Sequence, residues 1–109
     1  MSDAAVFRTR VEGELRRAMR DRDAITVTAL RSVLSAVDNA SAVDASAHDP
    51  STSEVPRRRV DLAEVRAIVQ RIAEEHEAAA RHYTDLGQHE TATRLLREAA
   101  SARRCLDAE

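Results

Sequence analysis

The sequence has few of the residues that interrupt helices, build aromatic cores or cross-link chains. Its 109 residues include two glycines, two prolines, one cysteine, no tryptophan and no lysine. Phe7 and Tyr83 are the only aromatic residues, so the aromatic interleaving that lets proteins stack nucleic-acid bases is missing. The scarcity of helix breakers and the abundance of alanine, the strongest helix former, favour an all-α fold.

The missing residue types also limit the chemistry. Gly13 and Gly87 cannot build a glycine-rich phosphate loop. Cys105 cannot form an internal disulfide, which is consistent with a reducing compartment, and near the C-terminus it lacks the base and pocket of a nucleophile. We predict that His76 is a hydrogen-bonded core or boundary histidine instead of a metal ligand, because His82 lies six residues on and points elsewhere. We therefore expect no catalytic residue, no metal and no cofactor.

Charge and hydropathy give a weaker signal. The net charge of −2 argues against a self-repelling disordered chain. All 17 basic residues are arginine, a bias that a GC-rich coding background explains. Charged residues interrupt any apolar region of a signal peptide, and no apolar run approaches the length of a membrane span. The sequence thus predicts a cytoplasmic protein with no membrane contact.

Apolar residues at helical spacing predict two N-terminal helices. Phe7, Val11, Leu15 and Ala18 form one stripe. A short joint at 21–23 follows, and its last residue, Asp23, is a good N-cap for a second helix. Apolar residues cover more than half the circumference of that helix, which predicts a central helix with several partners.

The remainder predicts a loop and a helical hairpin. Residues 41–59 are rich in serine and aspartate and contain both prolines, so they are expected to be a flexible loop. Asp61 and Glu64 form a variant capping box at the start of a third helix, and Gly87 suits its end. A fourth helix carries a narrow seam of alanine and leucine at Ala92, Leu95, Ala99, Ala102 and Leu106. We predict one domain over residues 1–109, a bundle of about four helices.

The arginines of the first two helices leave two interpretations open. The stretch "LRRAMRDRDAITVTALRSVLSA" contains Arg16, Arg17, Arg20, Arg22 and Arg31. Glu12 lies four residues from Arg16, and Glu14 lies three from Arg17, so local ion pairs can account for part of this charge. The alternative is a phosphate-binding surface. The same choice applies to Arg57, Arg58 and Arg59, which either offset the acidic start of the third helix or form a basic arm.

Two blocks of the chain resemble one protein family. The segment "AMRDRDAITVTALRSVLSAVDNA" is similar to the signature of YqeY-like proteins, which resemble the tail domain of the GatB subunit of tRNA-dependent amidotransferases. The matching positions are Ala18, Met19, Arg20, Arg22, Asp23, Leu30, Arg31, Leu34, Ala36, Val37 and Asn39. The segment "AAARHYTDLGQHETATRLLREA" resembles the family's helix, glycine turn and helix, with Tyr83, Gly87, Leu96 and Glu98 in place.

The chain also departs from the family pattern. Glu74, Glu75 and His76 replace a stretch that is often basic, and Gln88 replaces a common arginine. Cys105, Leu106 and Asp107 stand where the family leads into a C-terminal subdomain. The resemblance therefore implies a short form with the N-terminal helical domain alone.

Two functional hypotheses follow. The resemblance implies a non-catalytic adaptor that binds tRNA or amidotransferase subunits, in systems whose carbon-nitrogen ligase activity uses glutamine as nitrogen donor. Its candidate contacts are Arg20, Arg22, Arg31, Asn39, Arg57, Arg58 and Arg59. The alternative is a purely structural domain that forms a homo-oligomer through the fourth helix and has no RNA role.

Overall fold

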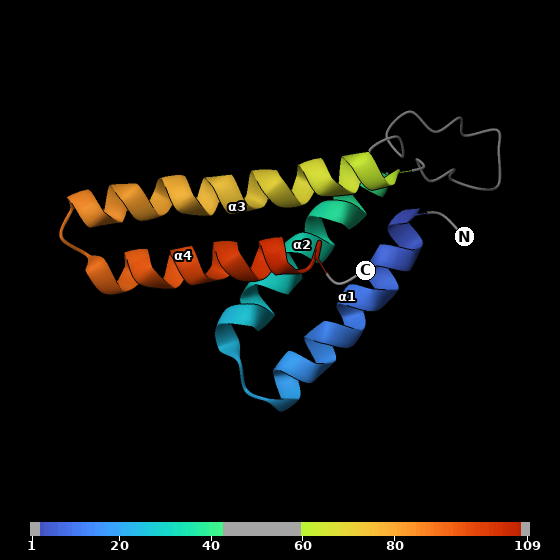
Figure 1. The fold of residues 1–109 in the computed structure, drawn as a ribbon, viewed down its shortest axis with the longest axis horizontal. Helices are drawn as coiled ribbons and strands as arrows, with labels where there is room; N and C mark the ends of the chain where they lie inside the picture. The colour runs from blue at the N-terminus through green and yellow to red at the C-terminus, as the bar shows by residue number, and fades with distance from the viewer. Residues whose placement is uncertain (1–2, 43–59, 108–109) are drawn as a thin grey trace.

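Four helices account for nearly all of the chain that the computed structural model describes, residues 3–42 and 60–107. They are α1 (Asp3–Arg20), α2 (Ala24–Ala42), α3 (Leu62–Asp85) and α4 (His89–Arg104). Neither described range contains a strand. The prediction of an all-α bundle of about four helices is confirmed (Figure 1).

Local signals begin and end these helices as the sequence predicts. Asp61 accepts a hydrogen bond of 2.8 Å from the Glu64 N–H at the start of α3. Gly87 follows α3 with a φ of 76°, a left-handed conformation that costs glycine little. α2 continues two residues into the predicted loop, to Ala42. Within this extension the Ser41 hydroxyl donates to the Val37 carbonyl at 3.1 Å, which satisfies the hydroxyl inside the helical turn. Residues 43–59 of the predicted loop lie outside the described residues.

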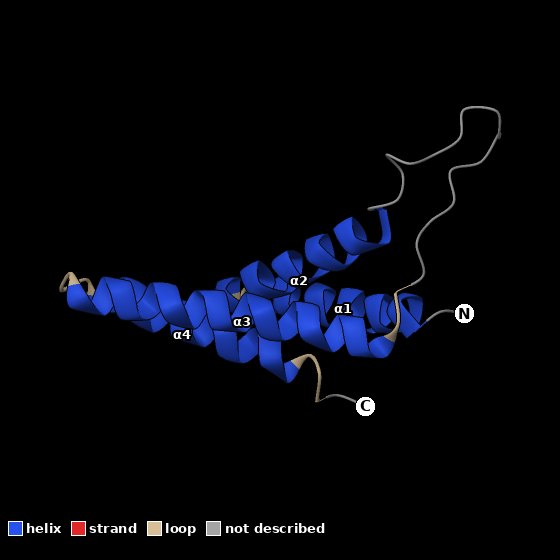
Figure 2. Cartoon of the chain, turned by 90° about the horizontal axis from the view of Figure 1, so that it is seen from above, coloured by secondary structure: helices blue, strands red, loops and turns tan. Residues whose placement is uncertain are grey.

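The helices form two antiparallel pairs. α3 and α4 lie side by side, and the α1–α2 pair forms a wedge that crosses them (Figures 1 and 2). α2 packs against α1, α3 and α4, so the prediction of a central second helix is confirmed. A bidentate ion pair joins α1 to α2: Arg8 Nε lies 2.8 Å from Asp38 Oδ1, and Arg8 Nη2 donates to Asp38 Oδ2 at 3.2 Å.

The core lies where the wedge meets the first half of α3 and the end of α4. Its fully buried members are mostly valine, and the largest of them is Leu30. Each buried side chain of this size contributes about 1.5 kcal/mol or more to folding. Phe7 and Val11 belong to this cluster, as their stripe predicts. Leu62 is 38% exposed, since it lies in the first turn of α3 at the margin of the core.

The second half of the α3–α4 hairpin is held by small residues and polar links. Ala73, Ala80, Ala92 and Ala99 are buried between the helices, where their small side chains allow a close approach. The Arg103 guanidinium donates two hydrogen bonds, of 2.9 and 3.3 Å, to the Glu77 carboxylate. The turn at the end of this hairpin projects beyond the wedge (Figure 1).

Candidate functional site

The turn between α1 and α2 contains an unusual arginine conformation. The Arg22 N–H donates to the Met19 carbonyl at 3.2 Å, and the Asp23 N–H donates to the Ala18 carbonyl at 2.9 Å. This is the pattern of a Schellman turn, whose central residue is usually glycine. Arg22 occupies that position with a φ of 56°, the only positive φ of a non-glycine residue in the described ranges. The side chain is exposed and has no hydrogen bond or ion pair to any described residue.

Asp23 then starts α2 as predicted. Its carboxylate accepts from the Thr26 N–H at 3.1 Å and from the Thr26 hydroxyl at 2.7 Å. These two hydrogen bonds hold the pKa of Asp23 below its usual value, and the positive charge of Arg104 acts in the same direction. The cap thus satisfies an N-terminal N–H of α2, and the effect of Arg104 shows that the end of α4 lies near the turn.

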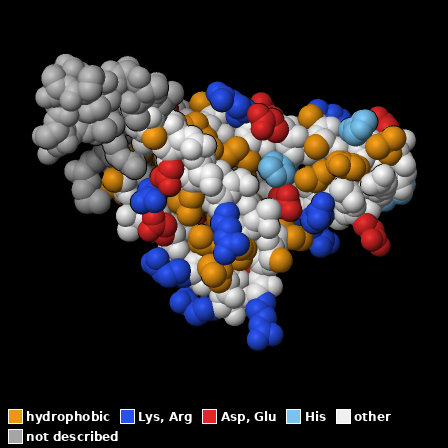
Figure 3. Space-filling model, turned by 180° about the vertical axis from the view of Figure 1, so that it is seen from behind, with side chains coloured by type: hydrophobic (Ala, Val, Ile, Leu, Met, Phe, Trp, Pro, Cys, Tyr) orange, Lys and Arg blue, Asp and Glu red, His pale blue; other side chains and the backbone are white. Residues whose placement is uncertain are grey.

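The arginines near the end of α1 are less paired than the sequence predicts. Glu12 forms an ion pair with Arg8 at 3.2 Å, instead of the predicted pair with Arg16. Arg16, Arg17 and Arg20 are exposed, and none has an ion pair within residues 3–42 and 60–107. Figure 3 shows arginine side chains gathered over the lower end of the wedge, where no acidic side chain is visible in this view. The end of the wedge at the α1–α2 turn is therefore a basic surface whose arginines are not neutralised by ion pairs within the described residues.

Arg31 and Asn39 lie on the solvent-exposed face of α2, and Ser35 lies between them on the same face. Eight residues separate Arg31 from Asn39, a distance of about 12 Å along a helix. Neither residue lines the two cavities found between α2 and α4. The predicted contacts thus form a broad surface instead of one pocket. Arg57, Arg58 and Arg59 lie outside the described residues.

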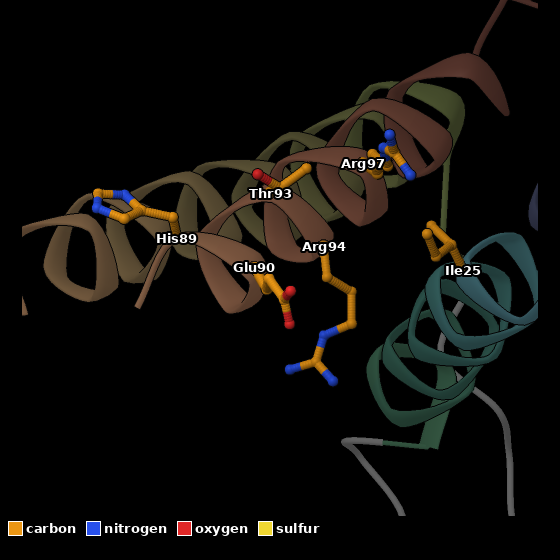
Figure 4. Close-up of a pocket in the computed structure, with 6 residues that line it drawn as sticks. All are labelled: Ile25, His89, Glu90, Thr93, Arg94 and Arg97. Carbon is orange, nitrogen blue, oxygen red and sulfur yellow. The ribbon is translucent and has the colours of Figure 1, made fainter. Parts of the chain in front are cut away.

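A groove between α2 and α4 is the feature that the sequence analysis missed. One part of it, about 280 Å³, lies between the first turn of α2 and the outer face of α4. Its polar lining includes Arg97, Ser101 and Arg104. A second part, about 340 Å³, shares Ile25 and Arg97 and extends along α4 to His89 (Figure 4). The sequence shows that Arg97, Ser101 and Arg104 share one helix face. It does not show that this face lies against α2.

His76 is a boundary histidine, as predicted. Its Nδ1 lies 2.8 Å from the Ile72 carbonyl oxygen, and its Nε2 lies 3.3 Å from Glu98 Oε2. Glu98 is 7% exposed, and Arg94 approaches its other oxygen at 4.0 Å. These contacts explain why Glu98 tolerates burial, since a buried carboxylate needs polar partners. No group of residues suited to hold a metal ion occurs in the described ranges.

Cys105 belongs to the buried core cluster, with 1% of its surface exposed. Burial raises the pKa of its thiol to about 12, and the negative charge of Glu14 adds to this shift. A thiol with so high a pKa is a poor nucleophile at neutral pH, because the thiolate is the reactive form.

The apolar seam of α4 is covered within the chain. Ala92, Ala99 and Ala102 are at most 4% exposed, whereas Leu96, on the outer side of the helix, is 50% exposed. A homo-oligomer through the fourth helix would therefore have to use the surface around Leu96. No helix in the described ranges is long and apolar enough to cross a membrane.

Comparison with models of protein families, with curated proteins and with solved structures finds no match to this chain.

Proposed function

We propose that this chain is a non-catalytic RNA-binding adaptor of the GatB/YqeY-like type. In this proposal the basic end of the wedge contacts the phosphate backbone of tRNA, in an assembly related to glutamine-dependent amidotransferases. Arg20 and Arg22 are the central contacts, and Arg31 and Asn39 extend the surface along α2.

The observation that supports the proposal is the conformation of Arg22. A residue with a Cβ costs about 1 kcal/mol more than glycine in the left-handed region. The Arg22 side chain is exposed and does not offset this cost through a hydrogen bond or ion pair with the described residues. Residues held in unfavourable backbone conformations concentrate at functional sites. An exposed guanidinium at this position is explained if it binds a ligand from outside the chain.

Binding to tRNA should be measured by electrophoretic shift at about 50 mM salt, where phosphate contacts are strong. Removing two phosphate contacts with the double variant Arg20→Gln/Arg22→Gln should weaken binding and reduce the slope of log K against log salt by about 2. The matched control is Arg71→Gln/Arg81→Gln, which removes two exposed arginines from α3, on the other side of the molecule from the turn. Absence of a shift with the wild-type chain, or equal weakening by both double variants, would overturn the proposal.

A second candidate function is docking to a protein subunit of the amidotransferase. The observation that favours it is Met19, which is 51% exposed beside Arg20 and one helical turn from Arg16. Methionine and arginine are both enriched in protein interfaces. In a pull-down with amidotransferase subunits, Met19→Ser should weaken protein capture. It should leave tRNA binding unchanged.

A further inference from the structure

The groove between α2 and α4 presents two arginines on either side of a serine. Arg97, Ser101 and Arg104 stand at positions i, i+4 and i+7 of α4, so they share one face of the helix. The two arginine positions are separated by about 10 Å along the axis. Ser101 lies between them in the part of the groove that faces the first turn of α2. Two long side chains can therefore converge above one hydroxyl group.

Neither guanidinium is neutralised by an ion pair within residues 3–42 and 60–107. Arg97 has no hydrogen bond to a described residue either, and Figure 4 shows it extending away from Glu90 and Arg94. Arg104 Nη2 donates to Ser101 Oγ at 2.8 Å. The remaining donors of both groups are available to a ligand, because a guanidinium has five N–H donors.

Hydroxyl groups form the inner wall of the groove. Ser101 is 3% exposed, and its Oγ lies 3.4 Å from Thr26 Oγ1 of α2. Thr26 donates its own hydroxyl hydrogen to Asp23. The Ser101 hydroxyl therefore keeps its hydrogen for Thr26 or for a ligand acceptor in the groove.

Asp23 is the acidic residue of this part of the groove. Its two oxygens already accept the Thr26 N–H and hydroxyl hydrogen bonds that cap α2. The charges of the two arginines exceed that of this one carboxylate, so the groove keeps a net positive charge. An acceptor-rich anion suits it better than a cation does.

We propose that this groove binds a phosphate group, with Arg97 and Arg104 as its charged ligands and the Ser101 hydroxyl as a third donor. A tetrahedral phosphate can accept from donors on opposite sides, whereas a planar carboxylate offers two oxygens in one plane. The phosphate belongs either to a small phosphorylated compound or to a nucleic-acid backbone. The site borders the α1–α2 turn at Asp23, but none of its three proposed ligands belongs to the turn, so phosphate binding here does not depend on RNA binding by Arg20 and Arg22.

The test is a titration of the ¹⁵N-labelled full chain with inorganic phosphate at constant ionic strength. Saturable amide shifts are expected at residues 23–26 and 97–104. Arg97→Gln, which changes an exposed side chain without a hydrogen bond to a described residue, should raise the dissociation constant about tenfold, and Arg97→Gln/Arg104→Gln should raise it further. Arg71→Gln/Arg81→Gln should bind phosphate as the wild type does. The spectra themselves report whether each variant is folded.

The groove proposal is overturned if the amide shifts of the wild type do not saturate with phosphate. It is also overturned if Arg97→Gln binds phosphate with the same dissociation constant as the wild type. The turn variant Arg20→Gln/Arg22→Gln should retain phosphate binding, which separates a failure of the groove from a failure of the proposed RNA contact. A tRNA gel shift with Arg97→Gln/Arg104→Gln then identifies the source of the phosphate. Weaker tRNA binding supports a nucleic-acid backbone, and unchanged tRNA binding supports a small phosphorylated compound.

Discussion

The Arg10 guanidinium in α1 donates a hydrogen bond of 2.7 Å to the main-chain carbonyl oxygen of Cys105, 95 residues further along the chain. The same guanidinium lies 5.3 Å from the centre of the Phe7 ring. α1 is thereby connected to the end of α4 at the margin of the core. A charged side chain on the first helix thus helps to hold the C-terminal end of the bundle in place.

Replacing this arginine should destabilise the fold. Arg10→Met keeps most of the aliphatic stem but leaves the Cys105 carbonyl without this donor, which should lower the free energy of unfolding by about 1–3 kcal/mol. Urea denaturation followed by circular dichroism measures the change. Arg16→Met, on an exposed part of the same helix, should change it by less than about 0.5 kcal/mol. Equal effects of the two substitutions would contradict a structural role for the Arg10 contact.

Arg22→Gly should stabilise the protein while weakening its proposed function. Glycine relieves the left-handed strain at φ 56°, and after its larger loss of unfolded-chain entropy the gain should be about 0.5 kcal/mol. The same change at Arg17, which has a helical backbone in the last turn of α1, should instead cost about 0.5–1 kcal/mol. Urea denaturation gives both values, and tRNA gel shifts should show weaker binding by Arg22→Gly. A less stable Arg22→Gly variant would show that the arginine is retained for the fold.

Cys105 should react very slowly with thiol reagents in the folded protein. Its pKa of about 12 makes the thiolate far scarcer near pH 8 than for a free cysteine, so modification should be about a thousandfold slower than in the unfolded chain. Alkylation followed by mass spectrometry, with and without concentrated urea, provides the comparison. A native rate close to the unfolded rate would show that Cys105 is accessible.

Acid should remove part of the stability that Asp23 provides. The folded-state pKa of Asp23 is lowered by its hydrogen bonds with Thr26. The contribution is therefore complete above the unfolded pKa of about 3.9, and it is lost as the pH falls through the lower folded value. Asp23→Asn keeps a capping side chain but does not titrate, so its stability should fall less than that of the wild type on acidification. Identical pH profiles would show that the Asp23 carboxylate is not coupled to folding.

Much of the secondary structure could be predicted because its signals are local. Asp23 and Asp61 cap helices by accepting hydrogen bonds from residues three positions further along the chain. Gly87 adopts its left-handed conformation directly after the end of α3. The Phe7 and Val11 stripe likewise needs only the period of a helix. The exposed positions of Arg20, Arg22 and Arg31 follow from the same pattern.

The sequence alone thus determined the all-α class, the helix boundaries to within a few residues and most of the buried stripes, because these depend on neighbours along the chain. Tertiary structure decided which faces meet. It placed Arg97 and Arg104 of α4 beside Asp23 and Thr26, paired the buried Glu98 with His76, and joined Arg10 to Cys105. The groove forms where the first turn of α2 lies against α4. The spacing of residues within one helix does not determine where a second helix will cross it.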